Sequence, residues 1–223
     1  MAIYRNAVKT LIAFLAVAAT AWPQSAGDVN ARYNTKEGRA QVAAVLSAPA
    51  RDKTQKPDAV VAALHLKPGM TVADVGTGVG YMLPYLSKAV GASGRVLGED
   101  VQPDFLDQAK AKVAAQKLSN VSLILGGFTD PKLPAGAVDV ELVLDVYHHF
   151  DEPAKMIAAL APALKPGGHL VIVEYHKANS PQPGHIVREW SDVVKEVESN
   201  GFRLVSKVDR ITDTQYMLTF GKK

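Results

Sequence analysis

The sequence predicts an α/β fold: a Rossmann-like parallel sheet with helices on both faces and a C-terminal antiparallel hairpin strand. Three observations support this fold class. Apolar, strand-like runs alternate with helix-like segments, a glycine-rich turn follows the first strong strand, and two β-rich runs succeed one another near the C-terminal end. Alternating strands and helices are typical of parallel strands joined by right-handed crossovers, which place helices on both faces of a sheet.

The elements are predicted in order from local signals. A helix is expected over 36–46, where Pro49 ends it, and Pro57 suits the first turn of the next helix. Further strands are expected near residues 71–75, 95–99, 121–125, 138–146 and 169–175, and further helices near 80–90, 103–116, 152–164 and 186–199. The β-rich runs 202–208 and 215–220 are separated by a short loop, so they predict a hairpin.

Composition limits the classes of function. The chain has 223 residues, of which 48% are hydrophobic and 21% charged, so it is long enough for one globular domain with a sizeable core. Its formal net charge of +3 gives no support to a nucleic-acid-binding surface, and a small substrate is expected. Cysteine is absent, which excludes disulfides, thiolate metal ligands and cysteine nucleophiles.

The N-terminal residues have the pattern of an export signal. Arg5 and Lys9 provide positive charge, residues 11–21 form an apolar run, and Ala19-Thr20-Ala21 offers small residues for cleavage. The sequence therefore predicts a signal peptide over 1–21 and export to the periplasm. The apolar run of eleven residues is too short to cross a bilayer, and no membrane span is expected after leader removal. A short buried helix, an uncleaved anchor and a cytoplasmic location remain alternatives. Residues 22–35 are predicted to be a flexible linker before a single domain over 36–223.

A glycine-rich turn between a strand and a helix predicts a nucleoside site. Gly76, Gly78 and Gly80 follow an apolar strand, and the acidic pair Glu99-Asp100 ends the next strand. Glycines allow a tight turn and close approach to a ligand, and a carboxylate about twenty residues on can accept protons from ribose hydroxyls. A dinucleotide motif would have its third glycine at the position of Tyr81, so a nicotinamide oxidoreductase is disfavoured.

Four motifs in order resemble those of the class I S-adenosylmethionine (SAM) dependent methyltransferases. They are the glycine turn with Asp74 before it, the acid Asp100, the segment 139–149, and the Leu-Lys-Pro-Gly-Gly turn within 164–174. The match runs from about Gln55 to the C-terminal end, and it implies the class I methyltransferase fold and SAM as cofactor. The cofactor-binding residues that the resemblance implies are Asp74, Gly76, Thr77, Gly78, Gly80, Tyr81, Asp100, Val101, Phe128 and Asp145.

Several of these positions have alternative interpretations. Asp74 either orders the glycine loop at the methionine end of the cofactor or caps the strand, and Tyr81 either packs on the first helix or lies over the sulfonium. After the third strand, relatives commonly place an acid that holds the adenine amino group, whereas this chain has Gly126-Gly127-Phe128. Phe128 is then expected to stack on adenine, with Asp130 or Thr129 as the substitute acceptor. Glu99 is expected in the last apolar slot of its strand, leaving the ribose to Asp100.

The loop after the fourth strand contains the candidate catalytic residues Tyr147, His148 and His149. A neutral histidine there can take a proton from a phenol or enol as the methyl group transfers, with His148 slightly preferred over His149. The alternative is structural: one histidine caps a helix and the other packs in the core. A metal site formed by Asp145, His148 and His149 is disfavoured because adjacent residues rarely point at one ion, so no metal is predicted.

The predicted function is transfer of a methyl group from SAM to a small-molecule acceptor, with no nucleic-acid partner. The loop lacks the Asn-Pro-Pro-Tyr type motif of exocyclic amine methyltransferases, and the absence of cysteine excludes the thiol-dependent methylation of cytosine carbon 5 and of arsenite. The alternative is an exported SAM- or nucleoside-binding protein without transferase activity, motivated by the leader, because SAM is made in the cytosol. The acceptor, the methylated atom and the oligomeric state are not encoded in any motif of the chain.

Overall fold

Seven strands form one sheet in the order β3-β2-β1-β4-β5-β7-β6 in a computed structural model that describes residues 29–180, 182 and 184–223. The strands are β1 (Thr71–Val75), β2 (Arg95–Asp100), β3 (Val121–Leu125), β4 (Val138–Leu144), β5 (Leu164–Tyr175), β6 (Phe202–Val208) and β7 (Gln215–Lys222). The first five strands pair in parallel, and β7 runs antiparallel to both β5 and β6. The predicted fold class, including the C-terminal antiparallel hairpin strand, is confirmed.

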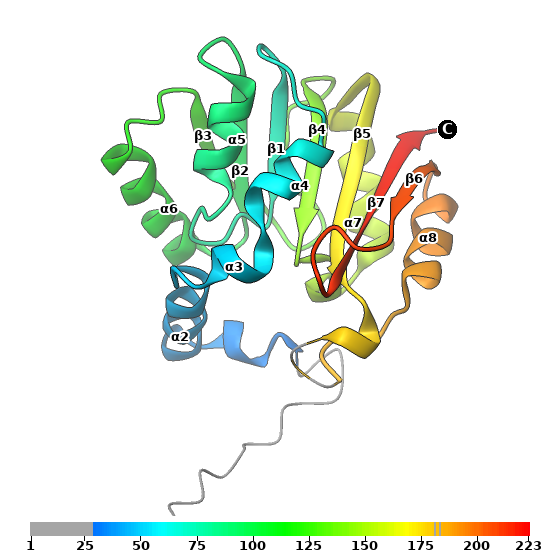
Figure 1. Cartoon of the computed structure of the whole chain (residues 1–223), viewed down its shortest axis with the longest axis horizontal. Coiled ribbons are helices and arrows are strands. Elements are labelled where there is room, and N and C mark those ends of the chain that lie inside the picture. Colours follow the sequence, from blue (N-terminus) through cyan, green and yellow to red (C-terminus); the bar gives the residue numbers. More distant parts are fainter. Residues whose placement is uncertain (1–28, 181, 183) are drawn as a thin grey trace, which may run out of the picture.

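Helices cover both faces of this sheet (Figure 1). The helices of the described residues are α2 (Lys36–Leu46), α3 (Arg51–Gln55), α4 (Pro57–Ala63), α5 (Leu83–Val90), α6 (Pro103–Ala115), α7 (Pro153–Leu160) and α8 (Trp190–Ser199), with short 3-10 turns η1 (Ala31–Asn34), η2 (Tyr147–His149), η3 (Ala161–Ala163) and η4 (Lys177–Asn179). Proline opens α4, α6 and α7, where its missing N–H group costs nothing and its fixed φ suits the first turn.

Two apolar layers hold the helices to the sheet. On one face, Val60 of α4, Leu86 of α5 and Ala109 of α6 are completely buried against β1 and its neighbours. On the other face, Ile157 of α7 and Val197 of α8 are completely buried in a second cluster. The hydrophobic periodicity of each helix therefore explains why it packs on the sheet with its apolar side inward.

Several boundaries differ from the sequence prediction: β5 begins at Leu164 rather than near residue 169, and α7 ends at Leu160 rather than near residue 164. Helix α5 begins at Leu83 rather than near residue 80, because Gly76, Gly78 and Gly80 all have positive φ and keep the chain out of the helical region. Helix α8 begins at Trp190 rather than near residue 186. The part of the predicted linker that the structure describes is ordered by contacts: η1 forms a 3-10 turn there.

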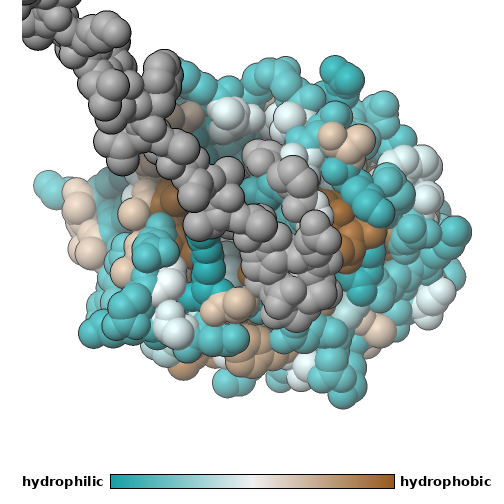
Figure 2. Space-filling view, turned by 90° about the horizontal axis from the view of Figure 1, so that it is seen from below, coloured by the Kyte–Doolittle hydropathy of each residue, from teal (hydrophilic) through white to brown (hydrophobic). Residues whose placement is uncertain are grey.

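The N-terminal segment and the segment that follows β5 meet below the carboxyl ends of the parallel strands. In Figure 1, η1, α2 and α3 lie under this edge of the sheet, next to the segment that follows β5. Figure 2, which views the molecule from below, shows a mostly hydrophilic surface with hydrophobic patches recessed between polar residues. The edge where ligands of parallel α/β folds bind is therefore partly covered by the N-terminal segment.

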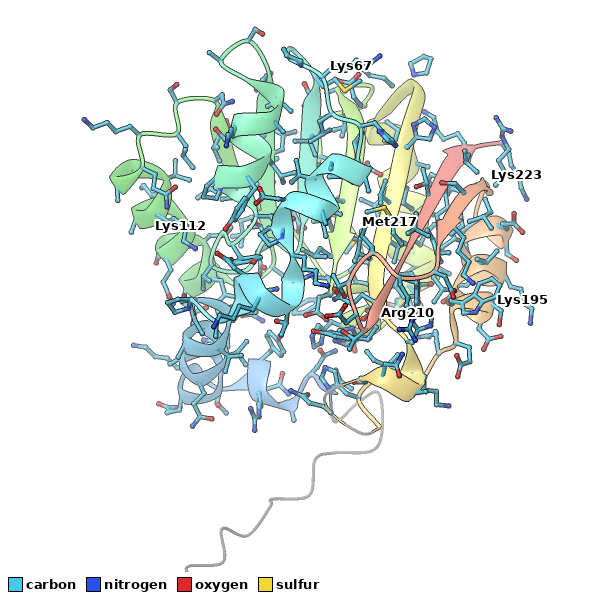
Figure 3. All side chains as sticks on the ribbon, viewed as in Figure 1. Lys67, Lys112, Lys195, Arg210, Met217 and Lys223 are labelled. Carbon is cyan, nitrogen blue, oxygen red and sulfur yellow. The ribbon has the colours of Figure 1, made fainter. Side chains whose placement is uncertain are left out.

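Charged groups are distributed around the outside of the domain. Of the side chains labelled in Figure 3, Lys67, Lys112, Lys195 and Lys223 lie at separate places on the periphery, whereas Met217 is buried within the sheet. In the described part of the chain, no helix combines the length and apolarity that crossing a membrane requires. The predicted signal peptide over 1–21 lies outside the described residues.

Glu141, in the middle of β4, is an unpaired acid in an apolar layer. Its side chain is completely buried, and neither carboxylate oxygen has a hydrogen-bond partner among the described residues. Burial raises the pKa of Glu141 to about 9, although Lys222 opposes the shift. Because the pKa in the folded state exceeds the ordinary value of 4.5, the neutral acid stabilises the fold at low pH, and this stability is lost as pH rises between the two values.

Glu141→Gln is therefore expected to flatten the dependence of stability on pH. Relative to the variant, the wild type should lose about 4 kcal/mol of unfolding free energy from pH 5 to pH 8. Urea denaturation at several pH values measures this difference. Glu37→Gln, at an exposed position of α2, is the control and should leave the profile unchanged. Parallel profiles for the wild type and Glu141→Gln would contradict the assignment of a buried neutral acid.

Candidate active site

A cavity of about 240 Å³ opens at the carboxyl ends of β1, β2 and β4. Its walls come from the glycine loop after β1, the acidic end of β2, the loop after β4, and the N-terminal segment that includes η1 and α2. The sequence-predicted cofactor residues that line it are Asp74, Gly76, Thr77, Gly78, Tyr81, Asp100, Val101, Phe128 and Asp145. The structure therefore brings together in one cavity residues that the sequence places on four different segments.

The loop after β1 makes a tight turn that depends on glycine at three positions. Gly76 and Gly78 have φ values of 70° and 57°, which L side chains rarely adopt. A Cβ atom on Gly76 would lie 2.6 Å from a methyl carbon of Val146, on the loop after β4. Gly80, the third predicted glycine, is placed differently: it does not line the cavity, and its Cβ would lie 2.8 Å from Leu83. Its role is therefore to let α5 pack closely.

Two of the predicted acids are held by the loop itself. The Thr77 hydroxyl donates to Asp74 over 2.6 Å, and the backbone N–H groups of Gly78 and Gln102 each donate to Asp100 over 2.8 Å. Burial raises the pKa of Asp74 and of Asp100 to about 6, against the opposing effect of these hydrogen bonds. Both acids are fixed in position, and each carboxylate oxygen retains a lone pair for a ligand.

Glu99 is a site residue that the sequence interpretation missed. It is buried and lines the cavity; one oxygen accepts the Gly76 N–H over 3.3 Å, and the other has no partner among the described residues. Burial, and then the neighbouring Asp100, raise the pKa of Glu99 to about 8. A Cβ on Gly126 would lie 1.7 Å from the free oxygen, so the glycine that replaces the family's acid after β3 makes room for Glu99.

The expectations for the adenine end are only partly met. Phe128 lines the cavity and remains 64% exposed, so its ring face is accessible for stacking. Asp130 and Thr129, which the sequence suggested as substitute acceptors, do not line the cavity, and Asp130 instead accepts the Lys132 N–H. Their proposed role is corrected: the unpaired acceptor on this side of the cavity is Glu99.

The N-terminal segment contributes cavity residues that no motif indicated. Tyr81 donates its hydroxyl to Asp52 over 2.7 Å, and the Arg51 guanidinium lies 4.2 Å from the centre of the Tyr81 ring. The ring face that was expected to meet a sulfonium is therefore occupied by a cation of this chain. Asn30 and Tyr33 also line the cavity from above His149. The contacts of Tyr81 with Asp52 and of Tyr33 with His149 join residues far apart in sequence, so no local sequence pattern indicates them.

The three predicted catalytic residues have different surroundings. Tyr147 is 1% exposed, packs in the core, and donates its hydroxyl to Glu196 over 2.5 Å, so its prediction as a catalytic residue is not supported by its position. His149 lines the cavity, with Nδ1 2.9 Å from the Asn30 side-chain oxygen and Nε2 3.3 Å from the Tyr33 hydroxyl. His149 is half-buried, whereas the neighbouring His148 is buried and does not line the cavity.

The pKa values of the two histidines shift in opposite directions. The Nδ1 atom of His148 lies 2.5 Å from a carboxylate oxygen of Glu174. Burial alone would lower the pKa of His148, but Glu174 outweighs it and the pKa is raised. Burial lowers the pKa of His149 well below the ordinary value, and His148 and His185 lower it further, so the imidazole that faces the cavity is neutral.

These residues fit a nucleoside joined to a charged amino acid, as in SAM. Glu99 has a free buried oxygen, Gly76 and Gly78 line the cavity without side chains, and Phe128 offers an aromatic face. Ribose hydroxyls need such acceptors, and a nucleobase needs an apolar or aromatic surface. The remaining acids, Asp74 and Asp145, suit a positively charged group.

Comparison with known proteins identifies the same family. A methyltransferase domain model matches residues 73–172. A SAM-dependent methyltransferase structure from Aquifex aeolicus is 31% identical, with a TM-score of 0.76, and the match covers 81% of this chain and 96% of that one. The mitomycin 7-O-methyltransferase structure, at 18% identity and a TM-score of 0.72 over 86% of this chain and 59% of that one, shows the same fold.

Curated relatives match over shorter shares of their length. Nocamycin O-methyltransferase of Saccharothrix syringae is 31% identical over 125 residues, which are 56% of this chain and 42% of that protein. The tRNA (adenine(58)-N(1))-methyltransferase TrmI of Thermus thermophilus is 34% identical over 147 residues, which are 66% of this chain and 52% of that protein. The chain thus spans about half or less of the length of these relatives.

Substitutions at Gly78 and at Asp100 are expected to weaken binding of the cofactor. Gly78→Val should abolish binding of SAM and S-adenosylhomocysteine, because its φ of 57° and its place in the cavity wall leave no room for a branched side chain. Asp100→Ala should weaken binding by about 1–3 kcal/mol through lost charge-assisted hydrogen bonds. Calorimetric titration with both ligands, and with NAD as the ligand that should not bind, measures these changes.

Gly221→Ala is the matched control, since a Cβ at this position of β7 makes only an ordinary contact 3.5 Å from Val205. It should bind SAM as the wild type does. Wild-type affinity in both Gly78→Val and Asp100→Ala would mean that the cofactor lies elsewhere.

Proposed function

The chain belongs to the class I SAM-dependent methyltransferases, and from that premise we propose that it transfers a methyl group from SAM to a small-molecule acceptor beside His149. One observation carries the proposal. A single cavity has the glycine loop and its acids on one wall and a neutral, half-buried histidine on the other. Donor and acceptor can therefore be held next to each other, which is what methyl transfer chiefly requires.

The chain's own residues have separate tasks in this proposal. Glu99 and Asp100 accept hydrogen bonds from ribose hydroxyls, Phe128 covers the base, and Asp74 and Asp145 lie where the positive charge of the amino-acid part is balanced. SAM supplies a methyl carbon made electrophilic by a sulfonium. The segment carrying Tyr33 excludes water from the cavity, because it packs over His149 with ring centres 4.9 Å apart.

Proton removal is assigned to the histidine cluster next to the acceptor. His149 is neutral and reaches the cavity, while His148 is held by Glu174 immediately behind it. An acceptor hydroxyl, enol or thiol must lose its proton as the methyl group is transferred, and imidazoles are suited to assist this loss. The sequence prediction preferred His148 slightly; the cavity lining favours His149 as the residue that meets the acceptor.

A small acceptor is favoured over a nucleic acid. Residues of η1, α2 and α3 line the cavity on one side, which leaves limited space for a macromolecule. Among the relatives, one is named for an O-methylated small molecule and another for a tRNA adenine. Incubation of the chain with methyl-labelled SAM and separate metabolite, RNA and protein fractions distinguishes these substrates; label in RNA alone would refute the proposal.

His149→Ala is expected to lower turnover by about 100-fold without changing the dissociation constant of SAM, because the imidazole meets the acceptor rather than the cofactor. The measurement is the release of S-adenosylhomocysteine at saturating acceptor, with SAM affinity from calorimetry. His169→Gln, in the first half of β5 and outside the cavity lining, is the control and should keep full turnover. Unchanged turnover in His149→Ala would leave the histidine a structural role.

The second candidate is a SAM-binding protein without transferase activity. The predicted export signal supports it, because a protein outside the cytosol needs a source of SAM. Such a protein would retain labelled SAM and release no S-adenosylhomocysteine with any metabolite fraction. The position of His149 against the cavity favours the enzyme, since binding alone needs no ionisable group on the acceptor side.

We also propose that residues 1–21 are an export signal that is removed after Ala21. The support is the order of positive charge, apolar run and small residues in the sequence. N-terminal sequencing of the native protein should give a terminus just after Ala21, or less favourably after Ala26, in the periplasmic fraction. A terminus at Met1 or Ala2 in the cytosolic fraction would contradict export and make cytosolic methylation the better account.

A further inference from the structure

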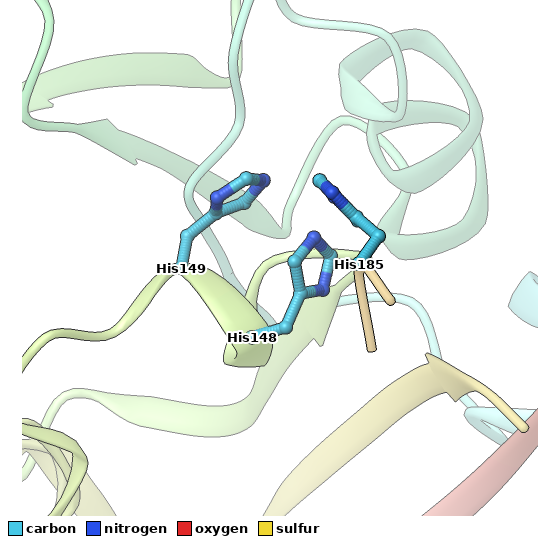
Figure 4. Close-up of side chains that lie close together, drawn as sticks. All are labelled: His148, His149 and His185. Carbon is cyan, nitrogen blue, oxygen red and sulfur yellow. The ribbon is translucent and has the colours of Figure 1, made fainter. Parts of the chain in front are cut away.

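Three histidines from two distant segments meet beside the cavity. His148 and His149 come from η2, and His185 comes from the loop before α8; one ring nitrogen of each lies within 4.8 Å of the other two. Figure 4 shows the three rings around a common space. The centre of the His148 ring lies 4.1 Å from the centre of the His149 ring and 4.6 Å from that of the His185 ring. The cluster is therefore compact enough for one small ligand.

The contacts of the cluster fix which nitrogens are free. His148 Nδ1 lies 2.5 Å from Glu174, and His149 Nδ1 lies 2.9 Å from the Asn30 side-chain oxygen, so both Nδ1 atoms are donors. Each of these rings then keeps its lone pair on Nε2, which in His149 lies 3.3 Å from the Tyr33 hydroxyl, a group that an ion would displace. His185 Nδ1 is buried and has no hydrogen-bond partner among the described residues. An orphaned buried nitrogen of this kind indicates a missing partner.

Glu174 and Asp145 add negative charge behind the rings. Glu174 is 1% exposed, and one ligand atom each from Asp145, His148 and Glu174 also lies within 4.8 Å of the others. Buried carboxylates are tolerated when a cation or hydrogen bonds compensate them. A carboxylate that holds the Nδ1–H of a histidine is the usual arrangement behind a metal-ligating imidazole, because it orients the ring and raises its basicity.

We propose that His148, His149 and His185 form a binding site for a zinc-class divalent ion, with Glu174 as the residue that positions His148. Imidazole ligands suit zinc and its transition-metal neighbours, whereas magnesium and calcium prefer oxygen. Bonds of about 2.0–2.1 Å in a tetrahedral site put ligand nitrogens about 3.4 Å apart, so the rings close in by about an ångström on binding. Three histidines leave a fourth coordination position open, as in catalytic zinc sites.

The open position has a consequence that rests on the proposed function. His149 is both a ligand and a wall of the cofactor cavity, so the fourth position opens toward the acceptor. A divalent ion held there would lower the pKa of an acceptor hydroxyl or thiol, so that water could take the proton while His149 serves as a ligand rather than as the base. The acceptor class is thus a small molecule with an ionisable oxygen or sulfur.

The test is metal binding by the untagged full chain after removal of adventitious ions with a chelator. Calorimetry with Zn²⁺ should give one equivalent, and Co²⁺ should give the visible absorption of a tetrahedral nitrogen site. His185→Ala and His149→Ala should each lower affinity more than 10-fold, and Glu174→Gln by about 10–100-fold. His169→Gln, outside the cluster, is the matched control and should bind as the wild type does.

SAM affinity is measured on the same samples, because it separates this proposal from the proposed function. His185 does not line the cofactor cavity, so His185→Ala should keep SAM affinity and lose the ion. Absence of a stoichiometric ion in the wild type, or wild-type metal affinity in His185→Ala, would overturn the metal site even if methyl transfer occurs. If His149→Ala does not fold, the loop variant His185→Ala decides alone.

Discussion

The site depends on buried carboxylates held by backbone N–H groups of the glycine loop. Gly76 donates to Glu99 and Gly78 donates to Asp100, across the gap between β1 and β2. These bonds require the loop backbone at positive φ, which only glycine adopts without strain. The loop therefore serves two purposes: it opens space for a ligand, and it offsets part of the cost of burying two adjacent acids.

The N-terminal segment completes the site from the far end of the sequence. Asn30 donates to the backbone oxygen of His149 over 3.0 Å and to Asp151 over 2.9 Å, while Arg39 forms a 2.7 Å ion pair with Asp104. These contacts hold η1 and α2 over the cavity, and α3 brings Arg51 onto Tyr81. The cavity is a property of the whole domain, because the methyltransferase motifs build only its floor.

The sequence predicted those features that local chemistry determines. Strand β1, the glycine loop and the order of strands and helices follow from hydrophobic runs and turn residues, and the structure has them. Glu99 was assigned to an apolar slot because strand periodicity gives no information about the neighbouring strand, where Gly126 provides its space. Asn30, Arg51 and His185 were missed because their site contacts join distant segments, which no local period encodes.

Side-chain contacts, rather than the backbone alone, bring the adjacent histidines after β4 together. Asp145 has a φ of 59°, in the left-handed region that is unfavourable for a residue with a side chain, and the turn η2 follows at once. Adjacent residues of a 3-10 turn project about 120° apart, so the turn alone does not bring the rings of His148 and His149 together. Their centres lie 4.1 Å apart with the ring planes tilted by 44°, and side-chain contacts hold them there. Glu174 of β5 holds the His148 ring, and Asn30 holds the His149 ring. Contacts from two distant segments therefore offset the backbone strain at Asp145. The proposed proton removal and the proposed ion site both depend on this cluster, which lies directly beside the cavity.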